Sequence, residues 1–173
     1  MKKSLGLWQF LGFGFTALFG TILHFLYDLT DGQTWAAFVS GVNESTWEHM
    51  KLLFVPMFVY ALLLWRVLRA EYPNYWCANL GGILFGLFLI PALFYAYNGC
   101  FGPSPDAVNI AIFFIAAALS YLLQTHLLRY GGCKVPAPAF LALVCLAVLF
   151  AVFSFAPPNL PLFLDPITKT YGR

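Results

Sequence analysis

Two histidines and several carboxylates lie in two neighbouring stretches of the chain, and their side chains are suited to binding a cation or a polar solute. His24 and Asp28 belong to the stretch TILHFLYD, and Glu44, Glu48 and His49 belong to the stretch VNESTWEHMK. Two imidazoles with one or two carboxylates satisfy a divalent ion such as zinc and leave a coordination position open. A metal-dependent hydrolase uses such an open position to activate a bound water molecule.

Helical periodicity groups these side chains into faces. His24 and Asp28 are four residues apart, so they share one face of a helix. At 100° per residue, Glu44, Glu48 and Lys51 form a single stripe on the second helix. An antiparallel arrangement of the two helices brings both groups together, and ionisable groups at this depth usually face a bundle interior or a water-filled cavity. The spacing of these residues does not match the HExxH zinc motif.

The same residues also have a purely structural interpretation. Ser45 and Glu48 fit a capping box, in which both side chains bind free amides at the start of a helix. Glu48 and Lys51 are spaced for an ordinary i,i+3 ion pair. Three aromatic residues are typical of a belt at the membrane interface: Tyr27, Trp35 and Trp47. This interpretation leaves the two histidines and the accumulation of acids unexplained.

The composition indicates that membrane-spanning helices position these residues. Hydrophobic residues make up 61% of the 173 residues and charged residues only 9%, against about 25% charged in soluble domains. A soluble fold of this length cannot bury so many apolar side chains. The apolar runs are continuous rather than alternating, which favours helices over a barrel. We therefore predict an all-α integral membrane bundle with no nucleic-acid partner.

Five stretches reach the roughly 20 residues that a helix needs to cross a bilayer. We predict one helical transmembrane domain over residues 1–173, with helices at about 5–27, 45–68, 78–97, 106–128 and 137–156. Gly82 and Gly86 form a GxxxG pattern, which predicts a close contact between helices. The apolar, proline-rich tail 157–173 is expected to lie along the outer face.

The distribution of basic residues predicts the orientation. With the N-terminus inside, six of the nine basic residues fall on the inner side: Lys2, Lys3, Arg66, Arg69, Arg129 and Lys134. Six of the seven acidic residues fall on the outer side, a bias that the charge rule does not explain. We therefore expect a multi-pass protein of the cell membrane, with its C-terminus and its His/carboxylate residues outside.

The four cysteines show neither a disulfide framework nor metal-binding spacing. Cys77 and Cys133 fall on the predicted inner, reducing side, Cys145 lies within the fifth helix, and Cys100 is alone outside. Disulfides are typical of oxidising compartments. The sequence therefore predicts no disulfide.

Three blocks of sequence carry a resemblance to a known family. HFLYD, VNESTWEHMKLLFVPM and the terminal LDPITKTYG, spread over the whole chain, resemble a family of small bacterial membrane proteins, the domain of unknown function family 6512. The resemblance implies a helical membrane protein, and it brings no assigned activity, cofactor or site. The alkaline-ceramidase-like membrane hydrolases are a poor match, because their seven helices carry a late pair of histidines that this chain lacks.

These observations leave three functions open. The first is binding of a cation or small polar solute by His24, Asp28, Glu44, Glu48 and His49, with Lys51 as a balancing charge. The second is a metal-dependent membrane hydrolase, with a divalent metal held among His24, His49, Asp28 and Glu44 and with its catalytic residues unknown. The third is a structural or accessory protein whose polar residues lock the helices together. A homo-oligomer or another membrane partner remains open for each of them.

Overall fold

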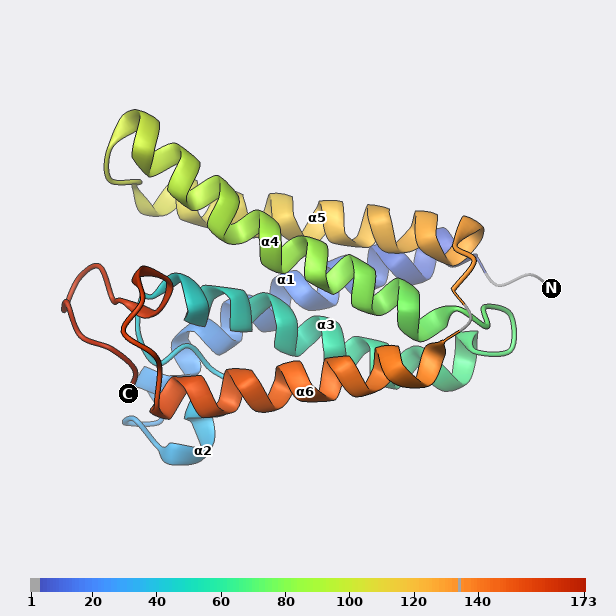
Figure 1. Ribbon diagram of the computed structural model, residues 1–173, viewed down its shortest axis with the longest axis horizontal. Coiled ribbons are helices and arrows are strands. Elements are labelled where there is room, and N and C mark those ends of the chain that lie inside the picture. The colour runs from blue at the N-terminus through green and yellow to red at the C-terminus, as the bar shows by residue number, and fades with distance from the viewer. Residues whose placement is uncertain (1–3, 134) are drawn as a thin grey trace.

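The computed structural model describes residues 4–133 and 135–173, and it is an all-helical bundle (Figure 1). Its long helices are α1 (Leu5–Leu29), α3 (Thr46–Leu68), α4 (Tyr75–Phe101), α5 (Asp106–Tyr130) and α6 (Pro136–Phe155). Two short helices are α2 (Thr34–Ala37) and the 3-10 helix η1 (Pro161–Phe163). The predicted all-α class is confirmed, and all five long helices are long and apolar enough to cross a membrane.

The helix bounds differ from the predicted ones mainly in α4. This helix covers Tyr75–Phe101, whereas hydropathy predicts only residues 78–97. Polar and aromatic residues at its two ends remain helical because helix formation does not require an apolar side chain at every position. Lys2, Lys3 and Lys134, on which the predicted orientation partly depends, lie outside the described residues.

The bundle is held together by close helix packing around α3 and between α4 and α5. Helix α3 contacts α1, α4 and α6, and α4 packs along α5. A Cβ atom at Gly82 would lie 2.9 Å from the Gln124 Cβ atom, and one at Gly86 would lie 2.6 Å from a Leu53 methyl group. These distances are too short for a side chain, so the predicted close contact at the GxxxG pattern is confirmed.

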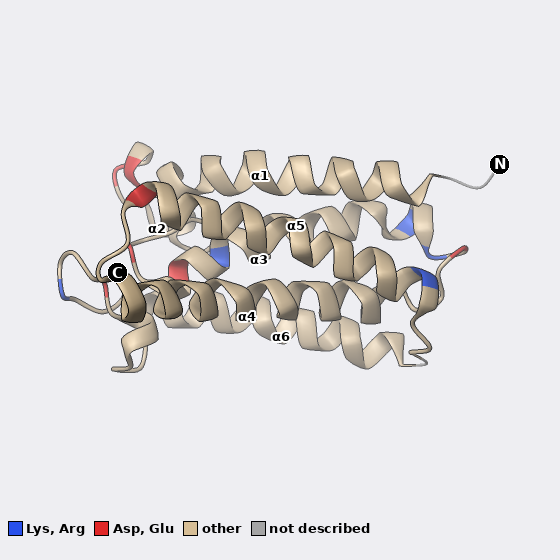
Figure 2. Ribbon diagram, turned by 90° about the horizontal axis from the view of Figure 1, so that it is seen from above, with Lys and Arg blue, Asp and Glu red and all other residues tan. Residues whose placement is uncertain are grey.

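Most acidic residues gather at one end of the bundle, which also carries the C-terminus (Figure 2). The C-terminal tail folds back over this end. The Arg173 guanidinium donates hydrogen bonds to the Tyr27 hydroxyl at 2.9 Å, the Thr34 hydroxyl at 2.7 Å and the Gly32 carbonyl at 2.8 Å. The tail is therefore tied to the end of α1 and to the start of α2, beside the residues that the sequence nominates for binding.

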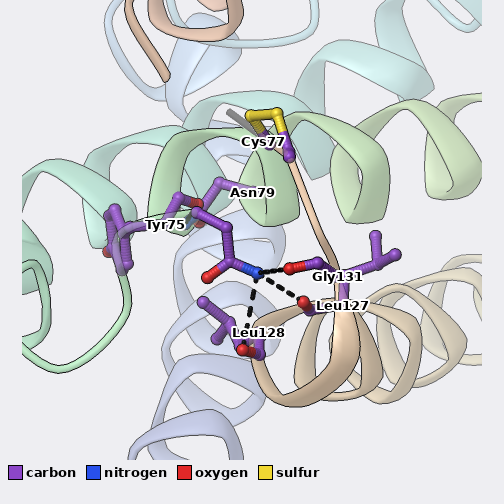
Figure 3. Close-up of a disulfide and its surroundings, with 8 residues drawn as sticks. Tyr75, Cys77, Asn79, Leu127, Leu128 and Gly131 are labelled. Carbon is purple, nitrogen blue, oxygen red and sulfur yellow. Dashed lines mark hydrogen bonds between the residues drawn. A yellow bond between two sulfur atoms is a disulfide. The ribbon is translucent and has the colours of Figure 1, made fainter. Parts of the chain in front are cut away.

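The prediction that the chain forms no disulfide is wrong. Cys77, near the start of α4, and Cys133, just after α5, form a disulfide (Figure 3). The start of α4 and the end of α5 lie at the end of the bundle opposite to the tail (Figure 1). The Asn74 amide nitrogen donates hydrogen bonds nearby to the carbonyls of Leu127 at 2.6 Å and Gly131 at 2.9 Å. The cysteines are 56 residues apart in sequence, and only the α4–α5 packing brings them together, so their spacing gives no signal.

The position of this disulfide bears on the predicted orientation. Arg66 and Arg129 lie in the last turns of α3 and α5, at the same end as the disulfide. The charge rule places this end inside, whereas disulfides are typical of oxidising compartments. The two observations indicate opposite orientations, and the orientation stays a prediction.

Thiol counting tests the disulfide. We expect the unfolded protein to react with two equivalents of maleimide without reductant, at Cys100 and Cys145, which are free and exposed. After reduction, four cysteines should react, because Cys77 and Cys133 are then released. Mass spectrometry of the labelled peptides identifies the sites, and labelling of Cys77 before reduction would contradict the structure.

Candidate functional site

His24, Glu44 and His49 come together at the acidic end of the bundle. His24 belongs to α1, His49 to the first turns of α3, and Glu44 to the segment just before α3. The Glu44 carboxylate places one oxygen 3.9 Å from His24 Nε2 and the other 3.5 Å from His49 Nε2. The exposed fraction of the side chain is 34% for His24, 42% for Glu44 and 28% for His49. The cluster is therefore partly sheltered and still open to a ligand.

These three side chains fit the ligand set of a divalent metal ion. One potential ligand atom from each residue lies within 4.8 Å of the others. A tetrahedral ion with ligand distances of about 2.0–2.1 Å holds its ligand atoms roughly 3.3 Å apart. Side-chain rotations that move each ligand atom by about an ångström bring the three atoms to this spacing. Two histidines and one carboxylate leave at least one position on such an ion for water or another ligand.

One histidine is already oriented for coordination. His49 Nδ1 lies 3.0 Å from the Ser45 carbonyl oxygen. When Nδ1 carries the proton and donates it to this carbonyl, the lone pair of Nε2 is free and points toward Glu44. Metal-binding histidines are commonly fixed in this way, through a hydrogen bond from the second ring nitrogen to a backbone carbonyl.

A buried serine fixes the segment that carries Glu44 against α1. The Ser40 hydroxyl donates a hydrogen bond to the Leu23 carbonyl and accepts one from the Tyr27 amide at 3.0 Å. Leu23 precedes His24 directly in α1. Ser40 therefore joins the helical turn that carries His24 to the chain segment that leads to Glu44.

The C-terminal tail supports the same segment from the other side. The Asn43 side-chain amide donates a hydrogen bond to the Gly172 carbonyl at 3.1 Å. The buried Asp165 carboxylate accepts hydrogen bonds from the backbone amides of Ile167, at 2.7 Å, Thr168 and Glu44. The tail thus contacts the backbone of the central cluster residue.

The hydrogen bonds of Asp165 also affect its titration. Burial alone would raise the pKa of this carboxyl, but the hydrogen bonds that it accepts lower the pKa below its ordinary value. Since the folded-state pKa is the lower one, this carboxylate stabilises the tail fully above its ordinary, unfolded-state pKa. That contribution is lost as the pH falls through the depressed folded-state pKa.

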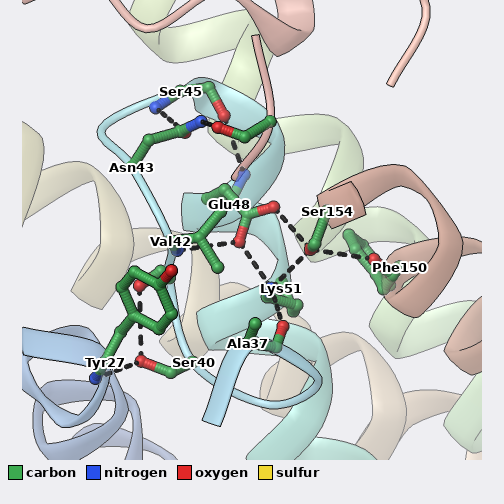
Figure 4. Close-up of polar contacts among 12 residues, drawn as sticks. Tyr27, Ala37, Ser40, Val42, Asn43, Ser45, Glu48, Lys51, Phe150 and Ser154 are labelled. Carbon is green, nitrogen blue, oxygen red and sulfur yellow. Dashed lines mark hydrogen bonds and ion pairs between the residues drawn. The ribbon is translucent and has the colours of Figure 1, made fainter. Parts of the chain in front are cut away.

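Glu48 and Lys51 form a separate, buried ion pair (Figure 4). The Lys51 Nζ atom lies 2.5 Å from a Glu48 carboxylate oxygen and donates further hydrogen bonds to the Ala37 carbonyl at 3.0 Å and the Ser154 hydroxyl at 2.7 Å. Ser154 donates to the other Glu48 oxygen at 2.7 Å, and the Val42 amide donates to Glu48 at 3.2 Å. Lys51 is 0% and Glu48 2% exposed, so the pair joins α2, α3 and α6 from within.

The structure therefore divides the six nominated residues. His24, Glu44 and His49 form the cluster, and Glu48 and Lys51 form the buried pair. Asp28 is exposed and does not belong to the cluster. The single stripe predicted for Glu44, Glu48 and Lys51 is wrong. Helix α3 begins only at Thr46, so helical angles do not apply to Glu44.

The structural interpretation of this region is confirmed in part. The Glu48 amide donates a hydrogen bond to the Ser45 hydroxyl at 3.4 Å, as in a capping box, but the Glu48 carboxylate binds the Val42 amide and not the Ser45 amide. Trp47 does not belong to an interfacial belt. Its ring is buried against Phe150, with ring centroids 4.4 Å apart, and against Phe163 at 4.8 Å.

Sequence reasoning missed several residues that support the cluster. Ser40, Asn43 and Ser154 were not nominated, although each makes a hydrogen bond that holds the cluster or the buried pair. For Ser154, a signal exists in the sequence, because it is a hydroxyl residue within the apolar run AVFSF. Ser40 and Asn43 lie in a loop of small and polar residues, where such residues are common and carry no signal of their own.

A pocket of about 230 Å³ adjoins the cluster. Glu44 and His49 line one side of it, and residues from α3, α4, α5 and the tail complete the wall. Its lining residues come from the parts of α3, α4 and α5 nearest the tail. Figure 1 shows that α4 and α5 diverge from α3 toward this end of the bundle. A ligand in this pocket would contact two of the three cluster residues.

Comparison with known proteins gives a family without an activity. A family of unknown function, DUF6512, matches residues 1–173, the whole chain. No curated protein and no solved structure matches the chain.

Proposed function

The chain belongs to the DUF6512 family of unknown function, and we propose that this polytopic membrane protein binds a divalent transition-metal ion between His24, Glu44 and His49. We place this site at the outer face of the cell membrane, the orientation that the basic residues predict. The observation that carries this proposal is the position of the Glu44 carboxylate, which has one oxygen near each imidazole.

The partners of Glu44 favour binding over a structural role. Its carboxylate is paired with two histidines, and no lysine or arginine forms an ion pair with it among the described residues. Two imidazoles and a carboxylate are a common ligand set for zinc and for iron, whereas magnesium and calcium prefer oxygen ligands alone. The helix-locking role that the sequence leaves open is accounted for by Glu48 and Lys51, which are buried and fully paired.

A metal-dependent hydrolase is the alternative that extends this proposal. It needs the same ion, with a water molecule in the open position, and a substrate in the neighbouring pocket. Only turnover separates a hydrolase from a binding protein, so metal binding is the property to test first.

Titration of chelator-treated protein with Zn²⁺ tests the proposal. We expect one equivalent to bind to the wild type and the His49→Ala variant to bind roughly 100-fold more weakly, because it loses a ligand. His126→Ala is the matched control, because His126 lies near the C-terminal end of α5, away from the cluster. Absence of binding to the wild type, or equal losses in both variants, would overturn the proposal.

A further inference from the structure

We infer that the pocket beside the cluster binds a single-chain amphiphile, with a small oxygen-bearing head group against the metal ion and an apolar chain in the cavity. This inference rests on the proposed metal site and names the class of ligand that the site accepts. Four features of the pocket lead to it: the gradient of polarity along its walls, its charge, its size and its place in the bundle.

The walls of the pocket change from polar to apolar with depth. At the end of the bundle, its lining includes Asn98, Asp106 and Asn109, at the end of α4 and the start of α5. Deeper in the bundle, the lining includes Ile90 and Ile112. Ile90 precedes Asn98 by eight residues, which is about 12 Å along a helix. A ligand that matches both regions has a polar head and an apolar chain.

The charges of the lining residues restrict the head group. Glu44 and Asp106 are acidic, and none of the described residues that line the pocket is a lysine or an arginine. Phosphate groups are usually bound by arginine or lysine, so a phosphate head group would have to rely on the metal ion alone. Among the described residues, the lining supplies no lysine or arginine charge, so the positive charge at the pocket would come from a divalent ion beside Glu44. A compact oxygen donor of the carbonyl or hydroxyl type fits such an ion.

The size of the cavity restricts the chain. Its volume of about 230 Å³ lies below the roughly 300–1,000 Å³ of pockets that enclose drug-sized ligands. It therefore accommodates one short apolar segment and not the two chains of a membrane phospholipid. Its walls belong to the ends of predicted membrane spans, and α4 and α5 diverge from α3 around it (Figure 1).

Alkyl hydroxamates of increasing length test this inference on the cobalt-loaded protein. Binding of Co²⁺ to the protein is measured first. Binding of each hydroxamate to the cobalt-loaded protein is then measured from the change in the visible spectrum of Co²⁺. Each buried methylene raises affinity roughly fourfold relative to water. Detergent micelles also bind the alkyl chain and so reduce this gain. We therefore expect the wild type to bind octanohydroxamate at least about tenfold more tightly than acetohydroxamate.

Two substitutions on one helix separate the cavity from non-specific partitioning. Ile112→Trp should abolish the chain-length gain without changing Co²⁺ binding, because Ile112 is buried and lines the pocket. Ile110→Trp should retain the gain, because Ile110 is exposed and lies outside the pocket lining. Phe94→Ala enlarges the cavity and should shift the preference to longer chains. This variant provides the test of the cavity if Ile112→Trp does not fold.

The outcomes distinguish the two proposals. If the wild type binds no Co²⁺, the proposed metal site fails, and this inference fails with it. If Co²⁺ binds but both hydroxamates bind equally well, the metal site stands and the amphiphile inference fails. The same holds if the gain in affinity with chain length is unchanged in both tryptophan variants and in Phe94→Ala. A chain-length gain that disappears in Ile112→Trp alone, or moves to longer chains in Phe94→Ala, supports the inference.

Discussion

Replacing Lys51 by methionine is expected to lower the free energy of unfolding by about 3–5 kcal/mol, because the Glu48 carboxylate is then left buried without its counter-charge. Both side chains are almost completely inaccessible, at 0% and 2% exposure. The substitution also removes the hydrogen bonds from Lys51 to Ala37 and Ser154, which join α2 and α6 to α3. Equilibrium unfolding in mixed micelles measures the loss.

Two further variants show whether the unpaired charge causes this loss. Glu48→Gln combined with Lys51→Met should recover much of it, since replacing a buried pair by neutral groups is often close to neutral. Lys169→Met should change the stability by less than about 0.5 kcal/mol, because this lysine is exposed in the tail. A loss below about 1 kcal/mol in Lys51→Met would show that the pair is not buried as described.

Replacing Glu44 by glutamine should lower metal affinity by roughly 100-fold or more, because the amide is a much poorer ligand than the carboxylate. The stability of the metal-free protein should change little, since the Glu44 side chain is 42% exposed. Competition with a chromogenic chelator measures the affinity, and thermal unfolding of the metal-free protein measures the stability.

Asp28→Asn is the matched control for this experiment. The sequence places Asp28 on the same helix face as His24, but the structure leaves it outside the group that gathers around Glu44. We expect its metal affinity to stay within about threefold of the wild type, since it contributes no ligand. If Asp28→Asn loses metal and Glu44→Gln retains it, the assignment of the carboxylate ligand is wrong.

Much of the fold follows from the sequence, because long apolar runs admit few structures in a bilayer. The five helices and the close contact at Gly82 and Gly86 are of this kind. The Cys77–Cys133 disulfide is not, because it depends on the packing of α4 on α5 and joins residues with no local pattern. The short helix α2 likewise spans only four residues, too few for a periodic signal.

The composition of the candidate site follows from the sequence less completely. The residue types point to the acidic end of the bundle, but the separation of Glu44 from Glu48 depends on where α3 begins. A single continuous helix from Glu44 would place both acids on one face. Because the chain enters the helix at Thr46, Glu44 is free to turn toward the histidines while Glu48 enters the bundle interior. The predicted helix, from about residue 45, already excludes Glu44, so the error lies in extending helical angles beyond the start of the helix.

Elemental analysis of the purified protein tests the central claim most directly, when wild type and a His24→Ala/His49→Ala double variant are compared. We expect close to one zinc or other transition-metal ion per wild-type chain, and a large loss in the double variant with its unfolding transition retained. His126→Ala, purified in parallel, should keep its metal. Wild-type protein without metal, with no uptake on titration, would contradict the account and leave the cluster as a pocket for a polar solute or a structural contact between α1 and α3.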